Sequence, residues 1–204
     1  MSIVKLSNNG VKNATAFGSI TALGDLIFIS RSTASSSSSV SITSGINSTY
    51  KEFIFVFNNI HPASNLQGFL FNGSTDGGSN YNVNKTTSLF RNRHKESGSD
   101  GEQTYDTSRD ITGTGGAYLN ALLSNDADGS LSGYLHLFDP SNTTFCKHFI
   151  SVTNEMNLYG DSSVGTHNVF VGGYFNTTSA INAVNFTMES GNIDSGTIDM
   201  YGVL

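Results

Sequence analysis

Four carboxylates stand close together in the 204-residue chain, and by type and spacing they are its best candidates for catalysis. A pair of carboxylates can supply the general acid and general base that hydrolyse a glycosidic bond. Basic residues 91–95 directly precede this segment, however, so a solvated polar loop explains it more simply. The chain also lacks the common nucleophile-elbow, zinc-protease and phosphate-loop motifs, and we expect no enzyme. The four carboxylates are Glu96, Asp100, Glu102 and Asp106.

A second segment has the oxygen-rich pattern of the first half of a calcium-binding loop. Residues 125–130 (NDADGS) alternate oxygen-bearing side chains and place Gly129 at the turn. The bidentate Glu that such a loop needs six residues later is Leu135 here, so a hairpin turn is the simpler interpretation. The five histidines have no ligand spacing. The single cysteine, Cys146, cannot form an intrachain disulfide and is expected to be a small buried residue. We expect no cofactor and no metal.

Tyrosines in or near Gly- and Asn-rich connections are the candidate contacts for a glycan or a partner. Sandwich proteins that bind sugars combine exposed aromatic rings with polar loop side chains. The absence of tryptophan, the usual stacking residue, counts against this interpretation. The candidates are Tyr105, Tyr118, Tyr159 and Tyr174.

Bulk composition excludes two classes of partner. The formal net charge is −6, which is unsuited to a phosphate backbone, so we expect no nucleic-acid binding. No stretch approaches the ~20 apolar residues of a membrane span, and the first ten residues lack a signal-peptide pattern. Only 13% of residues are charged, about half the usual ~25%, and Gly, Ser, Thr and Asn take their place. This is the composition of short strands joined by tight turns.

The elements that must position these residues are predicted to be strands. From residue 50 onward, apolar runs alternate with turns rich in Gly, Asn and Asp, which predicts roughly eight to ten short strands. Residues 53–57 (FIFVF) are apolar at every position, which predicts a central strand covered on both faces. Only residues 118–123 have a pattern that could be helical. We therefore expect an all-β fold, an antiparallel, jelly-roll-like β-sandwich over residues 46–204.

Residues 1–45 are predicted to form an extended N-terminal arm ahead of this domain. Within the arm, residues 23–29 have the pattern of a strand. The serine run from Ser35 to Ser39 fits either a flexible linker or an edge strand. The arm is the natural candidate for attachment to a larger assembly. Its apolar candidates for that contact are Ile3, Val4, Leu6 and Val11.

Four sequence blocks, taken in order, resemble small β-rich virion proteins of tailed bacteriophages. They are residues 48–63 (STYKEFIFVFNNIHPA), 74–81 (STDGGSNY), 131–141 (LSGYLHLFDPS) and 190–203 (SGNIDSGTIDMYGV). The resemblance implies a non-enzymatic part of the virion, either a capsid decoration or a component of a head or tail fibre. It also implies other virion proteins as partners, assembly in the host cytoplasm, and a homo-oligomer, for which a trimer is one common form. The alternative is a carbohydrate-binding module that recognises cell-surface glycans without catalysis.

Overall fold

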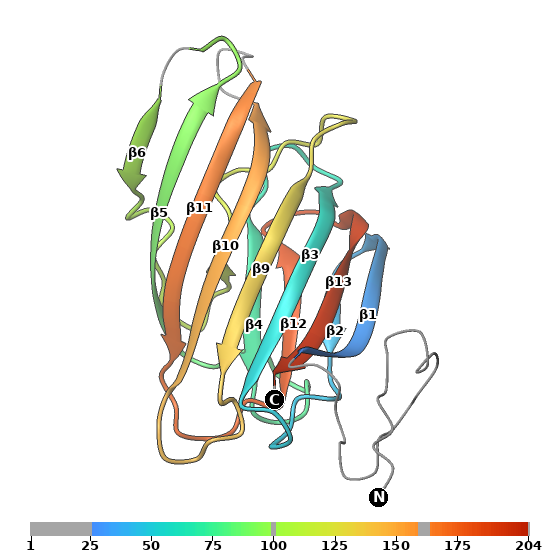
Figure 1. Cartoon of the computed structure of the whole chain (residues 1–204), viewed down its shortest axis with the longest axis vertical. Coiled ribbons are helices and arrows are strands. Elements are labelled where there is room, and N and C mark those ends of the chain that lie inside the picture. Colours follow the sequence, from blue (N-terminus) through green and yellow to red (C-terminus); the bar gives the residue numbers. More distant parts are fainter. Residues whose placement is uncertain (1–25, 99–100, 159–163, 204) are drawn as a thin grey trace, which may run out of the picture.

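The computed structural model describes residues 26–98, 101–158 and 164–203, which form two antiparallel β-sheets. The larger sheet has nine strands, and its main path runs from β1 to β6 (Figure 1), with β7 paired to β5 off this path. Its main order is β1 (Leu26–Ser37), β13 (Ile193–Val203), β3 (Glu52–Pro62), β9 (Leu131–Phe138), β10 (Lys147–Leu158), β11 (Val164–Phe175), β5 (Lys85–Lys95) and β6 (Glu102–Tyr105), with β7 spanning Thr112–Gly113. The smaller sheet is β2 (Val40–Ile42), β12 (Ala183–Met188), β4 (Phe69–Ser74) and β8 (Ala117–Tyr118).

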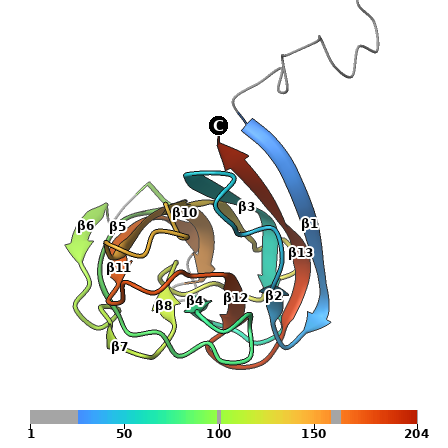
Figure 2. The same ribbon diagram turned by 90° about the horizontal axis from the view of Figure 1, so that it is seen from below.

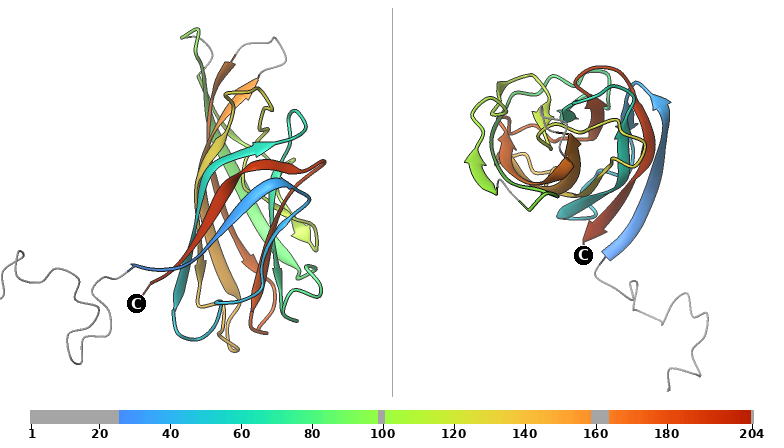
Figure 3. Two further views of the ribbon diagram at one scale, coloured as in Figure 1. Left: turned by 90° about the vertical axis from the view of Figure 1, so that its right-hand side faces the viewer. Right: turned by 90° about the horizontal axis from the view of Figure 1, so that it is seen from above.

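The large sheet is strongly curved and wraps around the small one (Figures 2 and 3). None of the residues that the structure describes is helical. The predicted all-β class with antiparallel, sandwich-like packing is therefore confirmed. Strand β13, at the end of the described chain, pairs with both β1 and β3 inside the large sheet.

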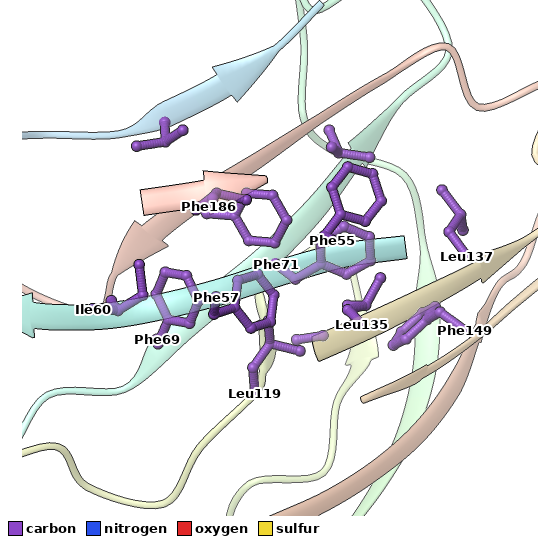
Figure 4. Close-up of a cluster of buried hydrophobic side chains, with 14 of the residues drawn as sticks. Phe55, Phe57, Ile60, Phe69, Phe71, Leu119, Leu135, Leu137, Phe149 and Phe186 are labelled. Carbon is purple, nitrogen blue, oxygen red and sulfur yellow. The ribbon is translucent and has the colours of Figure 1, made fainter. Parts of the chain in front are cut away.

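The space between the sheets is filled by phenylalanine rings (Figure 4). Phe57 of β3 packs against Phe69 of β4 and Phe186 of β12, with ring centroids 5.3 and 5.4 Å apart. Phe71 of β4 meets Phe149 of β10 at 5.2 Å. All five side chains are fully buried, and buried aromatic pairs stabilise a core beyond their area alone. This cluster holds the two sheets together.

Strand β3 differs from the prediction on one face. Its position inside the large sheet and the full burial of Phe53, Phe55 and Phe57 match the expected central strand. Ile54 and Val56 point to the other face and are only half-buried. Within the described ranges, neither sheet nor loop covers this outer face as the small sheet covers the inner one. The expectation that both faces of this strand are buried was wrong.

The segment 118–123 is not helical, contrary to the sequence pattern. It continues from β8 as an extended connection along β4, where the Leu119 amide donates to the Phe69 carbonyl at 2.8 Å. Leu119, Asn120, Ala121 and Leu123 are all buried, and Leu123 forms a bridge with Gln67 ahead of β4.

The sandwich begins earlier than residue 46. Strands β1 and β2 belong to the large and the small sheet, so residues 26–42 are part of the folded unit and not of an arm. Strand β1 runs through the serine-rich segment to Ser37 and pairs Ser35 with Ser195, which shows an edge strand there. The four apolar candidates for attachment lie outside the described residues.

Candidate functional site: the outer face of the nine-stranded sheet

The outer face of the large sheet carries an unusual number of apolar side chains. The register of successive strand pairs places six outward-facing residues side by side across the sheet. This apolar row consists of Val56, Tyr134, Val152, Phe170, Phe90 and Tyr105, on β3, β9, β10, β11, β5 and β6. Period-two alternation explains the row, because each strand places every second residue on this face.

Several apolar side chains of the outer face, inside and outside this row, are open to solvent. Phe28 is 54% exposed, Ile150 50%, Tyr134 41% and Phe90 40%. Eight large hydrophobic residues are exposed in the part of the chain that the structure describes, and six of them lie on this face: Leu26, Phe28, Phe90, Tyr105, Tyr134 and Ile150. A concentration of exposed apolar side chains on one face marks an interaction surface.

Several side chains of the outer face are held in place by contacts with neighbouring side chains. Phe90 and Phe170 stack with their centroids 4.9 Å apart, and Phe28 meets Tyr201 edge-on at 5.6 Å. At the β1 edge, the Arg31 guanidinium donates two hydrogen bonds of 2.7 Å to the Asp199 carboxylate. These hydrogen bonds lower the pKa of Asp199 and tie β1 to β13. The outer face is thus a pre-formed surface.

A hollow of about 290 Å³ interrupts the outer face over β10, β11 and β5. We call it the glycine furrow, because Gly172 of β11 lies between Ile150 and Ser88 and leaves open space above the sheet. Its lining residues are Thr86, Thr87, Ser88, His148, Gly172, Gly173 and Tyr174. His148 and Tyr174 are cross-strand partners with ring centroids 5.9 Å apart.

A second hollow, of about 310 Å³, adjoins the furrow at His148. Its other lining residues are Phe138, Asp139, Asn142, Phe145 and Cys146. Phe145 is the most exposed large hydrophobic residue, at 69%. Cys146 is half-buried beside His148, so its expected burial in the core was wrong.

A larger polar hollow of about 530 Å³ lies between β3, the turn at residues 127–130 before β9, and the start of β13. The His61 ring bridges its walls, with Nδ1 3.6 Å from Asp194 and Nε2 3.1 Å from the Asp126 carbonyl. Residues 125–130, which have the calcium-loop pattern, form a turn here, closed by the Gly129 amide on the Asp126 carbonyl at 2.8 Å. No group of three or more His, Cys, Asp or Glu side chains in the described ranges is placed to hold a metal ion.

The four candidate tyrosines do not form one site. Tyr105 and Tyr174 lie on the outer face, where Tyr105 donates to Asp110 and Tyr174 lines the furrow. Tyr118 belongs to the small sheet and donates to Glu189 at 2.8 Å. Tyr159 lies outside the described residues.

The candidate catalytic carboxylates are engaged with neighbouring cations. Glu102 is 2.6 Å from Arg93, and Asp106 is 3.5 Å from Arg91, across the β5–β6 hairpin and the turn after it. Glu96 lies in the exposed end of this region, and Asp100 falls outside the described residues. Ion pairing at a hairpin accounts for the charges that the sequence gathers here.

Sequence reasoning missed a buried polar cluster at the opposite end of β10. The carboxylate of Glu155 is fully buried and accepts hydrogen bonds from the amides of Ala121 and Leu122, at 3.1 and 2.9 Å, and from the Asn120 side chain at 2.5 Å. His167 Nδ1 lies 3.0 Å from the same carboxylate. The alternation of β10 was an available signal, since it places residue 155 on the inner face with Phe149. The cluster fixes the connection after β8.

No family model matches this chain, and searches of curated proteins and of solved structures found no match either. The similarity to phage virion proteins therefore stays a prediction from the four sequence blocks. Among the described residues, no helix is long and apolar enough to cross a membrane.

Proposed function

We propose that this protein is a structural component of the surface of a tailed-phage virion, a capsid decoration or a part of a head or tail fibre. It acts by assembly with other virion proteins and with copies of itself. The observation that carries the proposal is the outer face of the large sheet, where rigid aromatic and aliphatic side chains are presented to solvent. Exposed apolar patches of this kind mark surfaces at which a protein meets a partner.

The β1 side of the outer face is the part best suited to attachment. Leu26 and Phe28 are its most exposed large apolar side chains, and Ile54 and Tyr134 continue the apolar surface across β3 and β9. In the sequence, residues 1–25, which hold the apolar candidates for the assembly arm, directly precede β1.

The chemistry of the described residues favours assembly over catalysis. The carboxylates that could have formed an acid and base pair neutralise arginines, and Glu155 holds backbone amides. The surface is polar but carries few charges, which suits close contact between subunits in many copies.

Mass spectrometry of purified intact particles, with copy numbers measured against the major capsid protein, tests the proposal. Hundreds of copies per particle would identify a capsid decoration, whereas a few to some tens would identify a fibre or an appendage. Absence of the protein from purified particles would overturn the proposal.

A further inference from the structure

We propose that the glycine furrow on the outer face binds a neutral sugar ring of a glycan. The site lies on the same outer face as the proposed assembly surface, but over β5, β10 and β11 and away from the β1 side, and it does not depend on that proposal. Three strands that are far apart in sequence build it: β5 and β10 supply its walls, and β11 supplies its floor.

The glycine at the floor is the first argument. A Cβ atom at Gly172 would meet nothing within 4 Å, and its φ lies outside the range that favours glycine. Neither backbone conformation nor packing therefore requires glycine here. Glycine inside a strand weakens the strand, and it often marks a place where a ligand approaches the backbone. By contrast, a Cβ at the adjacent Gly173 would lie 2.7 Å from Phe149 of the core, so packing explains that glycine.

The chemistry of the walls is the second argument. Outward-facing Thr86 and Ser88 supply hydroxyls that both donate and accept, as sugar hydroxyls require. His148 and Tyr174 supply ring surfaces against which the C–H face of a sugar can pack. No carboxylate, lysine or arginine lines the furrow. This lining selects an uncharged polyol.

The polar hollow near His61 provides a contrast. It is larger, but it is lined by Asp128 and Asp194, and His61 is its only aromatic residue. A neutral sugar would have to share its walls with two carboxylates and would find no tyrosine or phenylalanine ring. The furrow is the smaller hollow and has the lining better suited to a sugar.

Size and surroundings fit one ring of a longer chain. The furrow, at about 290 Å³, lies near the lower end of the ~300–1,000 Å³ typical of small-ligand sites. The adjoining hollow beyond His148 offers Phe138 and Phe145 to a second ring. A short oligosaccharide that runs from β11 over β10 to the loop between β9 and β10 is therefore the expected ligand.

The furrow can stay open when the assembly surface is covered. The proposed assembly surface runs from β1 to Tyr134 on β9, and β9 is two strands from β11; with neighbouring strands about 4.8 Å apart, that separation is roughly 10 Å. Covering the β1 side of the sheet leaves the furrow facing solvent.

Saturation-transfer NMR and calorimetric titration of the full chain test the site. The probes are hexasaccharides of glucose, of mannose and of N-acetylglucosamine, with an oligogalacturonate as the charged comparator. We expect saturable binding of at least one neutral hexasaccharide. Gly172→Leu fills the furrow and should weaken that binding at least about tenfold.

Asn168→Leu is the matched control, because it adds the same side chain to the outer face of the same strand, four residues from the furrow. It should change the affinity by less than about twofold. Tyr174→Ala is a second test and should also weaken binding. The proposal is overturned if no neutral hexasaccharide binds up to about 10 mM, if only the charged probe binds, or if Gly172→Leu binds as the wild type does. None of these outcomes bears on particle assembly, which is measured separately.

Discussion

Both faces of the nine-stranded sheet carry apolar side chains, but the two faces differ in how far those side chains are buried. On β3, Phe53, Phe55 and Phe57 point inward and are fully buried, while Ile54 and Val56 of the same strand point outward and are half-buried. The inner face meets the small sheet, and the outer face meets no other layer of the described chain. A strand that is apolar at every position therefore does not show which of its faces is buried. That depends on where a second layer packs.

We expect inner-face residues to determine the stability of the fold and outer-face residues to determine assembly. Inner residues contribute to folding because the fold itself removes them from water. Outer residues stay in contact with water in the folded chain; if the proposed assembly covers them, their substitution should change association and hardly change the free energy of unfolding. Substitutions on each face test this distinction.

The largest effect is expected at the aromatic core. Phe57→Ala removes a ring that packs against Phe69 and Phe186, and it should lower the free energy of unfolding by about 3–5 kcal/mol. Val56→Ala, the adjacent outward position, should cost less than about 1 kcal/mol. Urea denaturation measures both. Equal losses at the two positions would show that the outer face is also part of the core.

A smaller effect is expected at the buried polar cluster. Glu155→Ala leaves the amides of Ala121 and Leu122 and the Asn120 side chain without their acceptor, and it should cost about 2–4 kcal/mol. Glu96→Ala, in the exposed turn after β5, is the control and should be close to neutral. If the two variants denature at the same urea concentration, the cluster does not anchor this connection.

The next effect depends on pH. Lys85 is buried, its Nζ donates to the Asn72 side chain at 2.5 Å and to the Gly115 carbonyl at 2.6 Å, and burial lowers its pKa from 10.5 to about 8. As pH rises from about 8 to 10.5, the folded chain loses this proton before the unfolded chain does, so the free energy of unfolding should increase. Comparing urea denaturation of the wild type and Lys85→Met across this window isolates the contribution.

Lys51→Met, at an exposed lysine, is the matched control and should keep the wild-type dependence. A wild type and a Lys85→Met variant with the same pH dependence would refute the lowered pKa.

The smallest effect on stability is expected on the outer face. Tyr134→Glu places a charge at an exposed position of the apolar row, and the free energy of unfolding should change by less than about 1 kcal/mol. Leu135→Glu, one residue along on the inner face, is the contrast and should prevent folding, because it buries an unpaired charge. Circular dichroism and urea denaturation distinguish the two. Loss of folding in Tyr134→Glu would contradict the separation of the faces.

The class of fold was predictable from the sequence because its signals are local. Turn residues such as Asp76, Gly77 and Gly78 and the alternation in β13 each report on a few neighbouring positions. The start of the domain was not predictable in the same way, because the serine-rich strand β1 gains its place only by pairing with β13, about 160 residues away. Nor could a helix be excluded for residues 118–123, whose extended form depends on contacts with β4 and Glu155.

The candidate sites were predictable only in part. Tyr174 was identified by its Gly- and Asn-rich surroundings, and it does line a hollow. Gly172, His148 and Thr86 come together through the register of three strands, which no single stretch of sequence specifies. Whether Ile54 and Val56 were covered was equally beyond the local pattern, because that depends on where the second sheet lies.

The most direct test of the proposed role in assembly compares particles assembled with wild-type protein and with the Tyr134→Glu variant. Mass spectrometry of the purified particles gives the number of copies of each protein relative to the major capsid protein. We expect the wild type to be present in a fixed copy number and the folded variant to be lost from the particles. Equal incorporation of the two proteins, or absence of the wild type from particles, would contradict it.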